Sequence, residues 1–210
     1  MTPFTQHRGV ALPLLRDNID TDAIIPSREM RTVSRSGLAA GLFAPWRYRD
    51  PDARTPNPEF ALNQPGYSGA SILLAGDNFG CGSSREHAVW ALMESGFRVV
   101  IAPSFATIFR NNALRNGLLT VALKQEGLDE LVAWVSADPL AHTINLDLEA
   151  CTIESDPEKD KKLFSVDPTA RDMLLKGLDE IGLTEQSMDL VSRFEGQDQI
   201  RRPWVYLASD

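Results

Sequence analysis

The sequence lacks the residues and runs that several classes of protein require. It contains only two cysteines, Cys81 and Cys151, far apart and without a Cys-x-x-Cys pair, which favours a reducing cytoplasm over a disulfide framework. No apolar run approaches the ~20 residues that a membrane helix needs. The first residues, Met1 to Gly9, contain no apolar segment typical of a signal peptide. We therefore expect a cytoplasmic protein that makes no membrane contact.

Positive charge is also in the minority. The chain carries 21 Lys and Arg against 29 Asp and Glu, a net charge of −8, which argues against a nucleic-acid surface. Hydrophobic residues make up 43% and charged residues 24%, as in ordinary soluble proteins. The length of 210 residues is enough to bury one core. We predict a single domain over residues 1–210 that ends in a helical extension.

One stretch, residues 76–87, holds more polar chemistry than any other part of the chain. Its sequence is Gly-Asp-Asn-Phe-Gly-Cys-Gly-Ser-Ser-Arg-Glu-His. The apolar run 70–75 predicts a buried strand before it, and residues 88–95 predict a helix that ends at Gly96. Glycines let the backbone approach a ligand closely, and the N–H groups of a helix start attract negative charge. The stretch therefore predicts an anion site with two hydroxyls and one guanidinium.

Familiar phosphate and nucleophile motifs do not fit this stretch. Residues 80–85 begin like a dinucleotide fingerprint, but Arg85 replaces the third glycine and no acidic residue follows about 20 positions later. A Walker A loop needs a lysine, and none precedes Lys124. A nucleophile elbow needs a glycine two residues after its serine, which neither Ser83 nor Ser84 has.

A purely structural interpretation of the stretch is a capping box. Ser83 would be the N-cap residue and Glu86 the N3 residue, each satisfying N–H groups of the first turn. This interpretation leaves Arg85 unexplained, because a cation in the first turn opposes the helix dipole unless an anion binds there. We favour a functional site, with the capping box as the alternative.

A second polar stretch lies near the start of the chain. Asp17, Asp20 and Asp22 precede the apolar pair and proline at 24–26. This pattern fits a polar loop that docks at a site and equally fits a plain Asx-type turn. An EF-hand calcium loop is less favoured, because the required glycine and terminal glutamate are missing.

Elsewhere, strands alternate with helices as far as about residue 135. We expect strands over 9–15, 70–75, 97–102, 118–123, 142–149, 151–154 and 162–166, and helices over 38–46, 103–117, 128–135, 169–176 and 184–194. The alternation indicates an α/β fold with a partly parallel sheet, and the later strands are expected to be antiparallel. Residues 49–69 contain several prolines and predict a long surface excursion. The tail Trp204–Leu207 either closes the core or meets a partner.

The two polar stretches together resemble the small subunits of 3-isopropylmalate dehydratase, which correspond to the swivelling domain of the aconitase superfamily. The resemblance rests on Asp-Thr-Asp-Ala-Ile-Ile-Pro at 20–26 and Asn-Phe-Gly-Cys-Gly-Ser-Ser-Arg-Glu-His at 78–87. Residues 103–112 and 177–184 extend it over about the whole chain. It implies a swivelling β/β/α domain like the aconitase C-terminal domain, with a mixed sheet and flanking helices.

The resemblance also implies a reaction, a cofactor and a partner. The family dehydrates 2-isopropylmalate and rehydrates the product to 3-isopropylmalate in leucine biosynthesis. A [4Fe-4S] cluster on the large subunit supplies the Lewis acid, so this chain is expected to bind no cofactor and to act only with that subunit. Cys81 is then a small loop residue and not a cluster ligand, in keeping with the cysteine count.

Residue roles follow from the matched motifs. Ser83 matches the catalytic base, and Ser84 and Arg85 match ligands of the substrate carboxylate, which Arg85 can bind as a bidentate pair. Asp22 matches an aspartate that organises the arginine network, and Thr21 is a further candidate. His87 is expected to be structural. A serine can act as a base only where its alkoxide is strongly stabilised, for example by N–H groups of a turn and helix start.

The segment after Pro26 is where members of this family differ with substrate. It reads Ser-Arg-Glu-Met-Arg, and Met30 could contact an isopropyl group. Arg28 and Arg31 exceed what that group requires, so Arg31 is a candidate substrate contact and both could instead face the large subunit. The alternatives are a related hydro-lyase acting on another alkylmalate, or a carboxylate-binding module without catalysis.

Overall fold

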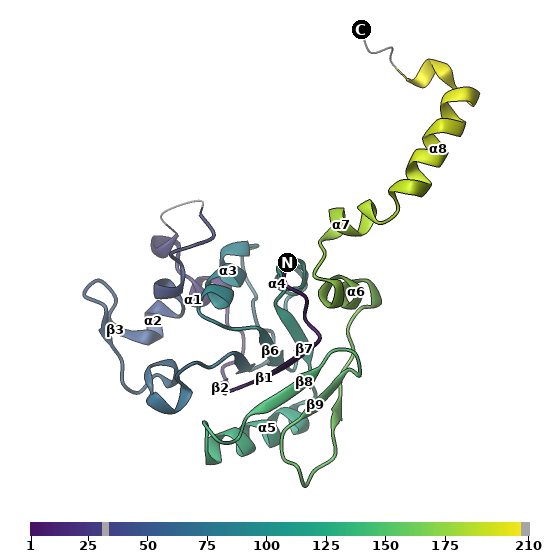
Figure 1. Ribbon diagram of the computed structural model, residues 1–210. Helices are drawn as coiled ribbons and strands as arrows, with labels where there is room; N and C mark the ends of the chain where they lie inside the picture. Colours follow the sequence, from purple (N-terminus) through teal and green to yellow (C-terminus); the bar gives the residue numbers. More distant parts are fainter. Residues whose placement is uncertain (31–33, 207–210) are drawn as a thin grey trace.

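Two four-stranded sheets form the body of the computed structural model, which describes residues 1–30 and 34–206. The parallel sheet has the order β2-β5-β6-β7, with strands Ala11–Leu14, Ile72–Ala75, Val99–Ala102 and Leu119–Ala122. The antiparallel sheet has the order β1-β8-β9-β10, with strands Gln6–Gly9, Ile144–Asp147, Thr152–Glu154 and Lys162–Leu163 (Figure 1). The α/β class is confirmed, and its parallel and antiparallel strands occupy separate sheets.

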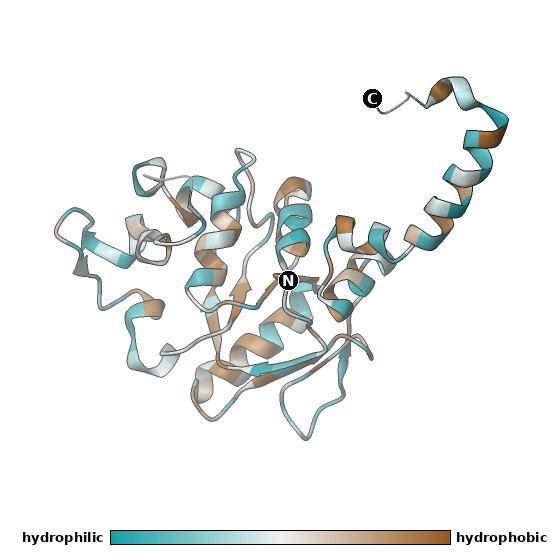
Figure 2. Ribbon diagram, turned by 45° about the horizontal axis from the view of Figure 1, so that its top comes forward, coloured by the Kyte–Doolittle hydropathy of each residue, from teal (hydrophilic) through white to brown (hydrophobic). Residues whose placement is uncertain are grey.

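The parallel sheet is buried on both faces. Leu73 and Ala75 join one apolar cluster, and Ile72 and Leu74 join the other, which explains why this strand is apolar throughout. Helices α3 (Glu86–Glu94) and α4 (Thr107–Asn116) supply buried side chains to the first cluster. Helix α5 (Gln125–Ala137) and the antiparallel sheet supply the second. Figure 2 shows the apolar strands enclosed between these layers, which gives the expected β/β/α arrangement.

The chain changes sheets near its start. Gly9 pairs with Ile144 of the antiparallel sheet, whereas Ala11 pairs with Ile72 of the parallel one. The single strand expected over 9–15 was therefore wrong, because an apolar run does not reveal a change of pairing partner. A side chain does not fit at Gly9, where the change occurs, because a Cβ there would lie 2.0 Å from the Oγ of Ser71.

Short elements connect β2 to β5. They are α1 (Thr21–Ile24), η1 (Ser27–Glu29), η2 (Ala39–Gly41), α2 (Ala44–Arg47), the hairpin β3 (Tyr48–Asp50) and β4 (Thr55–Pro56), η3 (Ala61–Asn63) and η4 (Pro65–Tyr67). The helix expected over 38–46 was wrong, because Phe43 has a φ of 51° and separates η2 from α2. The surface excursion over 49–69 contains the hairpin except for its first residue, Tyr48.

Helix α4 begins four residues after the expected first turn at Pro103. Phe79 donates its N–H to the Ser104 carbonyl at 3.1 Å, and Ala106 donates to the Phe79 carbonyl at 3.0 Å. These bonds keep the chain extended up to Ala106. The expected end is confirmed, since Gly117 caps the helix with a φ of 91°.

The C-terminal part consists of α6 (Pro168–Lys176), α7 (Glu180–Glu185), α8 (Met188–Arg201) and η5 (Pro203–Val205). Helix α8 extends away from the body (Figure 1), and Phe194 on it is 60% exposed. Trp204 is 76% exposed, so it does not close the core, and Leu207 lies outside the described residues. In the part of the chain described, no helix has the length and apolar character to cross a bilayer.

Candidate functional site

Three loops meet at the carboxyl edge of the parallel sheet, where open α/β sheets bind their ligands. They follow β2, β5 and β6. Asn18 donates its N–H to the Asp77 carbonyl at 2.8 Å, and Gly80 donates to the Ile19 carbonyl at 2.7 Å. The Phe79 and Phe105 backbones form a further parallel bridge. Backbone hydrogen bonds thus bring the two polar stretches of the sequence side by side.

Aspartate side chains reinforce these loops. Asp17 accepts the Asp77 N–H at 2.8 Å, and Asp77 accepts the Ser104 hydroxyl at 2.6 Å. Asp20 caps α1 by accepting the Ala23 N–H at 2.6 Å. Two of the three aspartates near the start of the chain therefore serve turns and caps, which leaves Asp22 to face the glycine-rich stretch.

The glycine-rich turn needs its glycines at two positions. Gly80 and Gly82 have φ values of 78° and 86°, in the region that disfavours other residues. A Cβ on Gly80 would also lie 2.2 Å from the Cγ of Phe109. The turn therefore packs tightly on α4 before the chain reaches the serines.

An ion pair joins the two stretches. Asp22 of α1 binds Arg85, which precedes α3, through an Oδ1 to Nη1 contact. The Arg85 side chain is 22% exposed and that of Asp22 is 53% exposed. Ser27 also donates its hydroxyl to Asp22 at 3.4 Å. The carboxylate orients the guanidinium while leaving part of it exposed.

Ser83 and Ser84 lie exposed next to this pair. Thr21, only 2% exposed, donates its hydroxyl to the Ser83 carbonyl at 2.9 Å. The Thr21 side chain is thus engaged in holding the Ser83 backbone. The arrangement presents two hydroxyls and a guanidinium at the start of a helix, which suits recognition of a carboxylate.

The capping-box alternative was wrong. The N-cap residue of α3 is Arg85, in an extended conformation and without a side-chain cap, so Ser83 lies outside the helix. Glu86 instead accepts a hydrogen bond from the Asn116 side chain at 2.7 Å. Thr21 binds the Ser83 carbonyl, and Ser83 and Ser84 are both exposed before the helix begins.

The remaining candidates fall in different places. Met30 is half-buried against the first apolar cluster, and Arg31 lies outside the described residues. The His87 ring packs on Trp90 with centroids 4.8 Å apart, which fits a structural role. Cys81 is half-buried in the bridge to Asp20. Within residues 1–30 and 34–206, no three His, Cys, Asp or Glu side chains converge as metal ligands do.

Sequence reasoning missed a group of charged residues around the segment 27–41. Arg54 contacts Glu29 at one described end of this segment and Ala40 at the other, and Glu94 contacts the end at residues 37–39. Glu94 is 57 residues from its partner Gly37, and the three charged residues form no motif. One signal was present, because Glu94 places a negative charge in the last turn of a helix, where it is unfavourable.

Comparison with known proteins places these features in a family. The family model described as the aconitase C-terminal domain matches residues 1–126. The 3-isopropylmalate dehydratase small subunit of Cupriavidus necator is 55% identical over 206 residues, covering 98% of this chain and 99% of that protein. The protein of the same name from Methylibium petroleiphilum is 48% identical over 212 residues, covering 98% and 97%. The crystal structure of 3-isopropylmalate dehydratase (leuD) from Methanocaldococcus jannaschii is 26% identical, covers 90% of this chain and 98% of that one, and superposes with a TM-score of 0.64.

Proposed function

The chain belongs to the aconitase C-terminal domain family, among the 3-isopropylmalate dehydratase small subunits, and on that premise we propose how its residues serve the reaction. It is the small component of a hydro-lyase of leucine biosynthesis and works with a large subunit. The reaction removes water from 2-isopropylmalate and returns it at the neighbouring carbon to give 3-isopropylmalate.

Ser83 is the proposed base, which takes the proton from the carbon next to the departing hydroxyl. Its own hydroxyl is exposed, and the Thr21 contact fixes its backbone beside the start of α3. The positive end of the α3 dipole, which lies at the N-cap residue two positions further along the chain, would favour the alkoxide form. When water adds back, the hydroxyl goes to the carbon that lost the proton, and Ser83 returns a proton to the carbon that lost the hydroxyl.

Arg85 and Ser84 are the proposed ligands of a substrate carboxylate. The contact between Asp22 and Arg85 is the observation that carries this proposal, because it joins residues 63 apart in sequence at the exposed serines. A guanidinium held in this way can present its planar fork to a carboxylate. Met30 would contact the isopropyl group, and the proposed role of Arg31 falls outside the described residues.

The iron–sulfur cluster of this family is proposed to reside on the large subunit. The residues of this chain do not fit it, since its only cysteines, Cys81 and Cys151, lie in different parts of the fold. A [4Fe-4S] cluster needs several thiolates at one place. This chain's contribution is therefore the base, the carboxylate contacts and the pocket for the side group.

The test is turnover of the complex reconstituted anaerobically with its large subunit. Ser83→Ala should lower kcat by about 10²–10⁴-fold, as expected for loss of a proton-transferring group. Because Ser83 is exposed and is not the cap of α3, the same change should alter the free energy of unfolding by less than about 0.5 kcal/mol. Ser68→Ala, at another exposed serine, is the matched control and should change neither quantity. Near-normal turnover of the Ser83→Ala complex would remove Ser83 as the base.

A further inference from the structure

A single carboxylate at the end of α3 binds three consecutive backbone N–H groups. Glu94 Oε1 accepts from Gly37 at 2.6 Å, and Oε2 accepts from Leu38 at 2.5 Å and Ala39 at 2.9 Å. These bonds, with that from Gly37 first, hold the pKa of Glu94 below its ordinary value. A carboxylate in the last turn opposes the helix dipole, so α3 itself gains nothing from it. Its stabilising contacts are those to residues 37–39.

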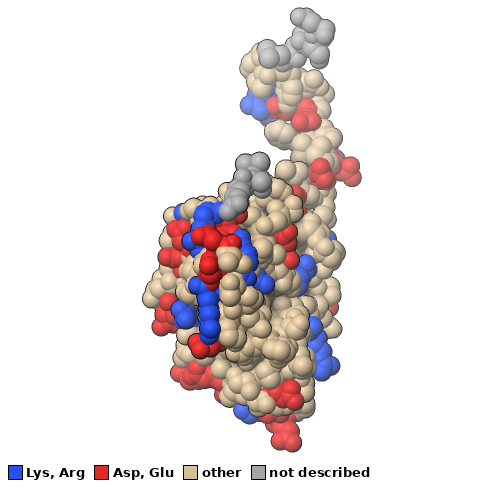
Figure 3. All heavy atoms as spheres, turned by 90° about the vertical axis from the view of Figure 1, so that its left-hand side faces the viewer, with Lys and Arg blue, Asp and Glu red and all other residues tan. Residues whose placement is uncertain are grey.

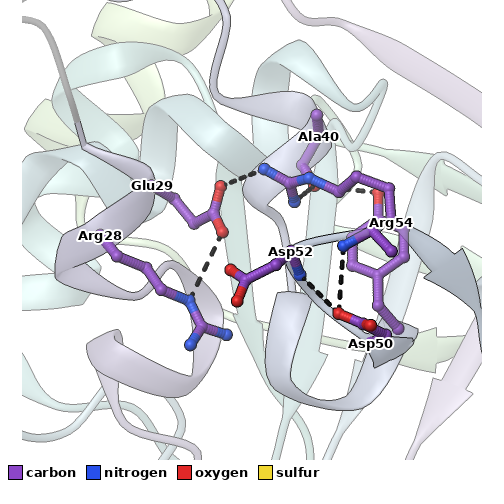
Figure 4. A network of polar contacts seen from close by, with 8 residues as sticks. Arg28, Glu29, Ala40, Asp50, Asp52 and Arg54 are labelled. Atoms are coloured by element: carbon purple, nitrogen blue, oxygen red, sulfur yellow. Dashed lines mark hydrogen bonds and ion pairs between the residues drawn. The ribbon is translucent and has the colours of Figure 1, made fainter.

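Arg54 joins residues 37–41 to Glu29, which lies earlier in the same connection between β2 and β5. Arg54 Nη2 lies 2.5 Å from Glu29 Oε2, and Arg54 Nη1 donates to the Ala40 carbonyl at 2.9 Å (Figure 4). Tyr48 donates its hydroxyl to the same carbonyl at 3.0 Å, and Arg54 lies over the Tyr48 ring. Arg54 thus joins η1 to η2 from the hairpin β3–β4.

The side chain of Glu29 is largely buried between Arg54 and Gly41. The Glu29 side chain is only 8% exposed, although its residue lies on a surface segment. A Cβ on Gly41 would come within 2.7 Å of the Glu29 Cβ, so the two ends of the segment pack directly on each other. Figure 3 shows acidic and basic side chains interleaved on the face that carries α2 and β3. Arg28 Nε also lies 3.7 Å from Glu29 Oε1, so two guanidiniums pair with this carboxylate. A largely buried carboxylate needs such cations, because an unpaired charge is costly away from water.

We propose that Glu94 and the Arg54–Glu29 pair are positioning residues that set substrate selectivity by holding residues 27–30, which end at Met30, together with residues 37–41. The inference rests on the proposed function. Helix α3 carries the serines and Arg85 just before its start and Glu94 at its end. The helix is about 13 Å long and separates the proposed reacting groups from residues 37–39.

The first measurement is native-state amide hydrogen exchange on the full chain. Glu94→Ala should speed exchange at Gly37, Leu38 and Ala39 by about tenfold or more, equivalent to about 1.4 kcal/mol of local opening. Glu94→Gln, which keeps one acceptor oxygen, should give a smaller increase. Glu180→Ala removes a carboxylate paired with Arg115 on another face and should leave these amides unchanged.

The second measurement is steady-state kinetics of the reconstituted complex. Glu94→Ala and Arg54→Ala should raise KM for 2-isopropylmalate about fivefold to tenfold, leave kcat within about twofold, and reduce the preference for it over a methyl-substituted malate. Arg54→Lys keeps the charge opposite Glu29 but loses the planar fork, so its KM should fall between those of wild type and Arg54→Ala. The Glu180→Ala complex is again the control.

Unchanged exchange at residues 37–39 in Glu94→Ala would overturn the inference. So would faster exchange combined with unchanged KM and unchanged preference, or a loss confined to kcat. If the wild-type complex does not convert 2-isopropylmalate, the proposed function fails. The preference is then measured between the alkylmalates that the wild-type complex does convert, so that an error in the substrate is distinguished from an error in the positioning.

Discussion

Replacing Gly80 by alanine tests whether contact with α4 shapes the glycine-rich turn. A Cβ on Gly80 would lie 2.2 Å from Phe109 Cγ and 2.6 Å from Phe109 Cβ. Phe109 is 3% exposed and packs edge-on against Phe79 with centroids 5.1 Å apart, so its ring has little room to retreat. The left-handed conformation costs roughly 1–2 kcal/mol for a residue with a Cβ. Overpacking typically adds about 1–3 kcal/mol.

We therefore expect Gly80→Ala to lower the free energy of unfolding by about 3 kcal/mol, within the summed range of about 2–5 kcal/mol. In a chain of this size, Tm should fall by roughly 6–12 °C, measured by circular dichroism on heating. The matched control is Gly69→Ala. Gly69 has a similar φ of 74°, but a Cβ there would meet nothing within 4 Å. The control should therefore lose only the conformational part, about 1–2 kcal/mol.

Equal losses for the two variants would refute the reasoning, because they would show that the contact with Phe109 contributes nothing. A second comparison tests the same contact. Phe109→Leu removes part of the ring that the new methyl group meets, so the double variant with Gly80→Ala should lose less stability than the sum of the single losses. A coupling above about 0.5 kcal/mol is expected for residues in contact.

Two further predictions concern charge. Asp22→Asn removes the charge opposite Arg85 in a partly exposed pair, so it should change the free energy of unfolding by less than about 1 kcal/mol. It should nevertheless raise the KM of the complex, and an unchanged KM would contradict the proposed role of Asp22. Burial, and then Arg98, lower the pKa of His7 from its ordinary 6.5, so the folded chain binds fewer protons than the unfolded one. The contribution of His7 to stability should therefore be present above pH 6.5 and be lost as the pH falls through the folded pKa. An NMR titration of His7 should have its midpoint below 6.5, and His7→Gln should remove this pH dependence of stability.

The parallel sheet could be predicted because its strands are buried on both faces. The runs 72–75 and 99–102 are apolar throughout and are followed by glycine and proline respectively, so their position did not depend on knowing their partners. Gly117 marked the end of α4 for a local reason as well, since the left-handed conformation favours glycine. Features decided by one or two adjacent residues were visible in the sequence.

Helix starts were less predictable, because contacts from elsewhere decide them. Ser83 satisfies the local pattern of a cap, but its carbonyl accepts a hydrogen bond from Thr21, and the helix begins only at Glu86. Pro103 likewise suits a first turn, but pairing with Phe79 holds the following residues extended. No local rule indicates that these backbone atoms already have partners.

The polar stretches of the site were recognisable, but the supporting contacts were not. Composition and spacing singled out the glycine-rich turn, and the family resemblance brought Asp22 together with Arg85. Glu94 is separated from its partner Gly37 by 57 residues and belongs to no motif. Only the folded arrangement of η2 against α3 shows what that carboxylate binds.

Strand β1 has a consequence for how the chain is made. Its residue Gln6 pairs with Asp147, 141 positions later, whereas the parallel sheet is complete once Ala122 is available. At about 5–20 residues per second, a ribosome needs roughly 7–30 s to deliver the partner of β1 after synthesising it. Throughout that interval the nascent chain carries an unpaired strand, which a holding chaperone could shield or another chain could capture. We infer that the parallel sheet assembles during synthesis and that the antiparallel sheet closes last.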